Sequence, residues 1–118
     1  MVIDFHTHAF PTDIAKSTIE KLAKGSGITP FVDGTVSGLQ NSMEKAGIDY
    51  SVILPIATRP SQAQSINTYA AQISGNDGIF SFGSIHPASE NWKSELDYIF
   101  SLGLKGIKLH PEYQQFYI

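Results

Sequence analysis

The stretch that decides the expected fold is "VIDFHTHAFP", residues 2–11. Its first seven residues read as a strand, and Pro11 begins a helix. Successive side chains of a strand point to opposite faces, so His6 and His8 share a face and their imidazoles converge. Burying both rings unpaired would cost about 1–3 kcal/mol per polar group. We therefore interpret the pair as ligands of a divalent metal ion; the alternative is a solvated pair at a strand end.

Outward from this stretch, apolar runs and helical patterns alternate along the chain. We expect strands at Val2–His8, Ser51–Ile56, Ile79–Pro87 and Gly106–Pro111, and helices at Pro11–Lys24, Val36–Ala46, Ser61–Ser74 and Asn91–Leu102. Alternating strands and helices predict an α/β fold with a parallel sheet and right-handed crossovers. The aromatic residues expected in its core are Phe80, Phe82, Tyr98 and Phe100.

Length and composition narrow the class of protein. The 118 residues suit one small domain, and 8 Lys and Arg against 11 Asp and Glu give no basic patch for nucleic acid. There is no cysteine, which excludes disulfides and thiolate chemistry. No apolar run is long enough for a membrane span, and no signal peptide precedes the first strand. We expect a cytoplasmic protein whose partners include neither nucleic acid nor membrane.

Four stretches carry a family resemblance. "IDFHTHAFP" resembles the opening of the amidohydrolase superfamily of metal-dependent hydrolases. "MEKAGIDYSVILPI", "GIFSFGSIHP" and "LGLKGIKLHPEYQQF" are similar to its amidohydrolase-related (amidohydrolase 2) branch, which includes aromatic-acid decarboxylases and lactone hydrolases. The resemblance implies that His6 and His8 bind the catalytic ion, usually zinc. It also implies a further His on a fifth strand and an Asp on an eighth, which commonly activates the metal-bound water.

The same resemblance implies an architecture. Members of the superfamily are TIM (β/α)8 barrels, which need about 250 residues. We therefore expect residues 1–118 to form a single partial domain, the N-terminal half of the barrel with four βα units and parallel strands, truncated after the fourth strand. The full-length parent would be the enzyme, and this fragment alone would be inactive. Its expected partner is the missing C-terminal half or a second copy in a homodimer.

Other polar residues lie near the ends of the expected strands. In "GIKLHP", Lys108 and His110 share a face, and we take His110 as a catalytic candidate near the metal; the alternative is a histidine bonded to loop backbone. Lys108 would pair with Asp4 or another acid rather than bridge two ions as a carboxylated lysine. Asp4 is also a candidate to orient a ligand imidazole. His86 is a candidate pocket residue, and Arg59 a candidate for a substrate carboxylate or a solvated loop residue.

The resulting functional hypothesis is a metal-dependent hydrolase acting on an amide, a lactone or a related carbonyl group of a small molecule. A decarboxylase of the same family is the first alternative. The second is a non-catalytic half-barrel that serves as an assembly or folding unit. A phosphoesterase of the polymerase-and-histidinol-phosphatase type also opens with two histidines, but "GIKLHP" fits it less well.

Overall fold

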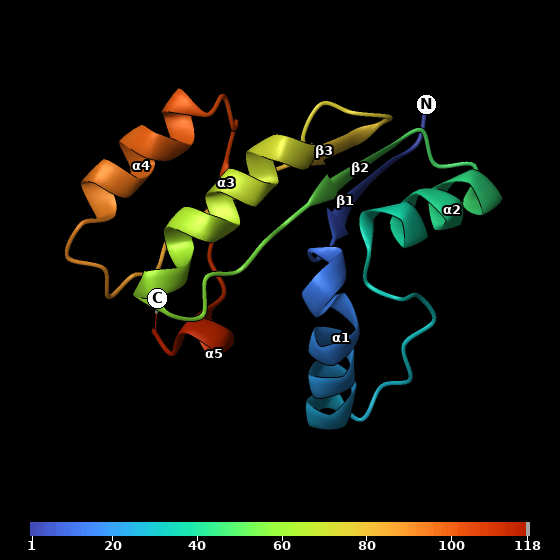
Figure 1. The fold of residues 1–118 in the computed structure, drawn as a ribbon, viewed down its shortest axis with the longest axis horizontal. Helices are drawn as coiled ribbons and strands as arrows, with labels where there is room; N and C mark the ends of the chain where they lie inside the picture. The colour runs from blue at the N-terminus through green and yellow to red at the C-terminus, as the bar shows by residue number, and fades with distance from the viewer. Residues whose placement is uncertain (118) are drawn as a thin grey trace.

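A computed structural model describes residues 1–117 (Figure 1). The strands are short and are β1 (Ile3–Thr7), β2 (Tyr50–Ile53), β3 (Ile79–Ser81), β4 (Gly83–Ser84) and β5 (Ile107–Lys108). The helices are α1 (Thr12–Ser26), α2 (Val36–Ala46), α3 (Ala63–Ile73), α4 (Trp92–Ser101), α5 (Pro111–Gln114) and the 3₁₀ turn η1 (Pro60–Gln62). Within the described residues, no helix combines the length and the apolar character needed to cross a bilayer.

All of the strand pairs are parallel, but they form two sheets. One sheet has the order β1-β2-β3, and the other pairs β4 with β5. Only Phe82 separates β3 from β4. The Phe82 N–H donates to the Ile53 carbonyl at 3.0 Å, and the next N–H, of Gly83, donates to the Gly106 carbonyl at 2.8 Å. The chain therefore changes its hydrogen-bonding partner at Phe82, and this change divides the sheet.

The expected half of a TIM barrel, with four consecutive βα units, is wrong. The sheets have three and two strands, β5 spans two residues, and two helices, α1 and α2, separate β1 from β2. Apolar periodicity indicates the type and order of local elements. It carries no information on how far a strand stays paired or which neighbour it pairs with, because those depend on hydrogen bonds between distant segments.

The helices contribute to two apolar clusters. The first contains Ala9, Met43, Ile53 and Ile79, and so joins α2 to β2 and β3; the second contains Ala70, Ile85, Ile99 and Leu104. Figure 1 shows α3 running along the same diagonal as β2 and β3, with α4 beside it, and α3 contacts β3, β4 and α4. The core is thus built on the helix-bearing face of the sheet, on both sides of α3.

None of the four aromatic residues expected in the core is fully buried: Phe82 and Tyr98 are half-buried, and the other two are exposed. Phe80 is 46% exposed and Phe100 is 83% exposed. Phe80 follows buried Ile79 in β3, and alternation turns it to the opposite face of the sheet. On that face it lies beside Tyr50, with ring centroids 5.9 Å apart. In the described part of the chain, this face of the sheet keeps large apolar side chains in contact with solvent.

Candidate functional site

The two histidines of the first strand lie side by side at its carboxyl end. The ring centroids of His6 and His8 are 5.2 Å apart, with 64° between the ring planes. Both side chains are exposed. The 5.2 Å separation of the ring centroids is compatible with two imidazole ligands of one divalent ion.

The strand under this pair is irregular. Asp4 pairs with Ser51 and Thr7 pairs with Ile53, so the register shifts by one residue between them, as at a β-bulge. The His6 N–H donates to Asp4 Oδ1 at 3.1 Å, within the irregular segment. The Asp4 carboxylate thus stabilises the backbone turn at His6. Within residues 1–117, no hydrogen bond or ion pair joins this carboxylate to an imidazole nitrogen or to Lys108.

His8 directly follows β1 and lies beside Leu54, the residue that follows β2. Partial desolvation of the ring lowers the pKa of His8 below its ordinary value of 6.5, although one face stays open to solvent. The positive forms of His6, Lys108 and His110 lower the pKa further, and the backbone of Leu54 acts in the opposite direction. Lys108 and His110 therefore lie within electrostatic range of His8, although about a hundred residues of sequence separate them from it.

His110 is the N-cap of helix α5, whose first residue, Pro111, is the end of the expected strand Gly106–Pro111. Its Nδ1 accepts the Tyr113 N–H at 3.3 Å, and its ring stacks on Tyr113 with centroids 4.4 Å apart and 16° between planes. Proline is favoured at the first position of a helix. Pro111 was therefore the available signal that His110 is an N-cap and that a helical turn follows.

Gln114, the last residue of α5, is a residue of the site region that sequence reasoning missed. Its side chain is 3% exposed and makes three hydrogen bonds. Oε1 accepts the His110 N–H at 2.8 Å, and Nε2 donates to the carbonyls of Ala57 and Ile85, both at 2.8 Å. A glutamine in a half-exposed tail gives no sequence signal of burial, because its partners come from other loops.

The remaining candidates play local roles. His86 is 8% exposed, and its Nδ1 accepts the Ala88 N–H at 3.1 Å in the turn after β4. Arg59 is exposed and precedes η1. The ion pair found among residues 1–117 joins the Met1 ammonium group to Asp49 at 3.7 Å, so the expected pairing of Lys108 with Asp4 does not occur there.

The described residues do not by themselves form a complete metal site. Within residues 1–117, no group of three or more His, Cys, Asp or Glu side chains is arranged to hold a metal ion. His6 and His8 supply two nitrogen ligands, whereas a catalytic zinc site has three protein ligands and a water. The imidazole nitrogens of the pair suit zinc, but a complete zinc site would need further ligands from outside the pair.

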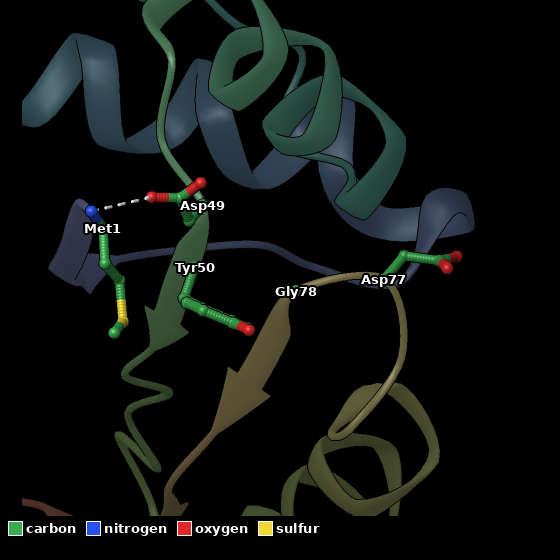
Figure 2. A pocket seen from close by; sticks show the side chains of 5 residues that line it. All are labelled: Met1, Asp49, Tyr50, Asp77 and Gly78. Atoms are coloured by element: carbon green, nitrogen blue, oxygen red, sulfur yellow. Dashed lines mark ion pairs between the residues drawn. The ribbon is translucent and has the colours of Figure 1, made fainter.

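A surface hollow lies at the opposite ends of the strands. It measures about 550 Å³ and is lined by Met1, Asp49, Tyr50, Asp77 and Gly78. Figure 2 shows the Met1 ammonium group directed at Asp49, while the Asp77 side chain points away from both. The two carboxylates therefore do not converge. This hollow is open and distant from the histidines, so we do not regard it as the site of chemistry.

Comparison of the chain with protein-family models, with curated proteins and with solved structures found no match in any of the three.

Proposed function

We propose that His6 and His8 bind one divalent ion, zinc by the chemistry of the ligands, and that the chain contributes this site to a metal-dependent hydrolase of the amidohydrolase superfamily. The observation that carries the proposal is the pair of imidazoles 5.2 Å apart at the end of β1. When bound, a divalent ion supplies Lewis-acid chemistry at that position. The substrate class that follows is a small molecule with an amide, lactone or related carbonyl group.

The surroundings of the pair support this proposal. His8 has a lowered pKa, which keeps its imidazole neutral and able to bind a cation near neutral pH. Lys108 and His110 supply a cationic group and a hydrogen-bonding imidazole within electrostatic range of His8. These two residues would orient an oxygen-bearing substrate group against the ion position. Further ligands would come from water, from substrate or from another polypeptide such as a second copy.

Two alternatives each have an observation in their favour. Lys108 beside His8 favours a substrate with a carboxylate, which is the requirement of a decarboxylase. The open apolar face of the sheet, with Ile3 and Phe5 both more than half exposed, favours an assembly unit without catalysis. Zinc binding distinguishes the assembly unit from the two enzymes, because an assembly unit needs no metal ion.

The test is zinc stoichiometry and affinity measured by calorimetry on protein that carries no affinity-tag histidines and has been stripped with a chelator. We expect one zinc per chain or per pair of chains. Removing one ligand, in His6→Ala or His8→Ala, should weaken zinc binding at least tenfold because one nitrogen ligand is lost. The zinc-loaded protein would then be assayed against lactones, amides and aromatic acids.

The matched control is His86→Asn, which removes an imidazole away from the pair and keeps a side-chain acceptor for the Ala88 N–H. We expect its zinc affinity to equal that of the parent protein. Absence of stoichiometric zinc, or equal affinity in the His6→Ala and His86→Asn proteins, would contradict the proposal and favour the assembly unit.

A further inference from the structure

Buried hydrogen bonds hold α5 against the strand ends. The side chain of Gln114 connects three separate segments: the loop after β2 through the Ala57 carbonyl, the end of β4 through the Ile85 carbonyl, and His110 through its own N–H. The Gln114 N–H also donates to the His110 carbonyl at 2.9 Å. The backbone of His110 is therefore held from both sides by one buried residue.

The hydroxyl group of Ser84 extends this network. Ser84 is fully buried, and its Oγ accepts the Ala57 N–H at 2.9 Å and donates to the Lys108 carbonyl at 3.1 Å. The backbone groups of Ala57 thus meet Ser84 on one side and Gln114 on the other. Lys108 and His110 lie at the carboxyl end of β5, within electrostatic range of His8, and both are attached to the same network.

The ring of His110 is also fixed. A neutral imidazole has one N–H donor and one acceptor nitrogen. Because Nδ1 accepts the Tyr113 N–H, the proton of the neutral ring belongs on Nε2. Stacking on Tyr113 at 4.4 Å restricts rotation of the ring. His110 therefore presents a donor, not a lone pair, at its outer nitrogen.

We propose that Gln114 is a positioning residue, and that with the Tyr113 N–H it holds His110 as an Nε2–H donor toward an oxygen atom of a ligand bound at the His6–His8 pair. This inference rests on the proposed function for the ligand position. It assigns His110 the role of hydrogen-bond donor, and excludes it as a metal ligand and as a general base through Nε2.

The first test uses the parent protein without metal. Nitrogen-15 NMR of the histidine rings distinguishes the two neutral tautomers. We expect neutral His110 to carry its proton on Nε2 at about 90% or more. An equal mixture, or a proton on Nδ1, would overturn the assignment. Because no metal is present, this result does not depend on whether the His6–His8 pair binds zinc.

The second test uses His110→Asn and the zinc-loaded protein, with acetate as the oxygen-bearing probe. Asparagine is a good N-cap residue, so its side chain can still accept the Tyr113 N–H and α5 is kept. The distal N–H donor is lost. We expect zinc affinity to stay within twofold and acetate affinity to fall about tenfold. Unchanged acetate affinity would leave His110 with a capping role only and would overturn the proposal.

The third test examines Gln114 through Gln114→Glu, which keeps an acceptor for the His110 N–H and loses the two donor bonds to Ala57 and Ile85. We expect a mixed tautomer for His110, acetate affinity reduced to the level of the His110→Asn protein, and zinc affinity unchanged. If Gln114→Glu does not fold, the milder Ser84→Ala, which removes the bond to the Lys108 carbonyl, takes its place with the same expected NMR change.

The outcomes separate this inference from the proposed function. Zinc binding lost in His6→Ala together with an unaltered His110 signal in Gln114→Glu would retain the function and reject the positioning role. A fixed Nε2–H tautomer in a protein that binds no zinc would reject the proposed function and, with it, the ligand-directed part of this inference.

Discussion

At the scale of single residues, His8 shows how the fold prepares a side chain for binding. Desolvation is the largest cause of its lowered pKa, followed by the positive form of His6 and, more weakly, by Lys108 and His110. The unfolded chain has the ordinary value of 6.5. The folded protein therefore protonates His8 less readily than the unfolded chain does. The contribution of His8 to the free energy of unfolding is fully present above pH 6.5 and is lost as pH falls through the lower pKa of the folded state.

We expect a proton NMR titration of the metal-free protein to give His8 a midpoint below 6.5, its ordinary value. Lys108→Met should raise this midpoint, because removing a positive neighbour favours the protonated ring. Zinc affinity of that variant should then begin to fall at a higher pH than in the parent protein, since only a neutral imidazole binds the ion.

The matched control for this titration is Lys105→Met, which removes an exposed lysine that does not affect His8. Its His8 midpoint should equal that of the parent protein. An identical midpoint in the Lys108→Met and Lys105→Met proteins would show that Lys108 does not face His8.

At the scale of elements, α2 is the helix whose ends are best specified by local sequence. The Thr35 side chain accepts the Gly38 N–H at 3.0 Å, as an N-cap residue does. Asp33 Oδ1 in turn accepts the Thr35 N–H at 2.9 Å and the Thr35 hydroxyl at 2.8 Å. These two bonds lower the pKa of the exposed Asp33 carboxyl below its ordinary value of 3.8. Their support of the cap is therefore lost as pH falls through this lowered pKa. Gly47, at a φ of 68°, ends the helix.

Gly38→Ala tests this cap. Alanine favours a helix by up to about 1 kcal/mol over glycine, but a Cβ at position 38 would collide with the Asp33 carboxylate and the Thr35 hydroxyl. We expect a net loss of about 1 kcal/mol in the free energy of unfolding, because the cap is broken. Urea unfolding measures it.

The control in α1 is Gly25→Ala, where a Cβ meets nothing within 4 Å. There the same substitution should stabilise by about 0.5–1 kcal/mol. If both variants gained stability equally, the capping network around Asp33 would have no energetic weight.

At the scale of the whole molecule, α3 joins the two sheets. Asn67 of α3 is fully buried; its Nδ2 donates to the Ser84 carbonyl at 2.9 Å, and its Oδ1 accepts the Ser84 N–H at 2.8 Å. The amide thus pairs with β4 as a neighbouring strand would. Since β3 and β4 are separated by one residue, this contact fixes the second sheet relative to the first.

Asn67→Ala should lower the free energy of unfolding by about 2 kcal/mol or more, because it leaves a buried N–H and a buried carbonyl of Ser84 without partners. Asn76→Ala is the control, since Asn76 is exposed and makes one side-chain bond, of 3.2 Å, to the Gln72 carbonyl; we expect a change within about 0.5 kcal/mol. Equal effects in thermal unfolding of the two variants would contradict the joining role of Asn67.

The predictable part of this molecule is local. The helix expected at Val36–Ala46 has those bounds, and the strand-to-helix order holds for the first four helices. The adjacency of His6 and His8 follows from two residues of one strand. Pro111 indicates the helical turn at Pro111–Gln114, whereas the expected strand Gly106–Pro111 ends there and no helix is expected after it.

What the sequence by itself determined is the type and order of the main elements, their parallel pairing and the pair of imidazoles on one strand, because these depend on side-chain period and on neighbours a few residues apart. Only the tertiary structure decided that the sheet divides at Phe82, that Phe80 faces solvent and that Gln114 lies under His110. Gln114 bonds to residues 57 and 29 positions away. Such bonds depend on which distant backbone groups remain unpaired after folding, and no local pattern records that.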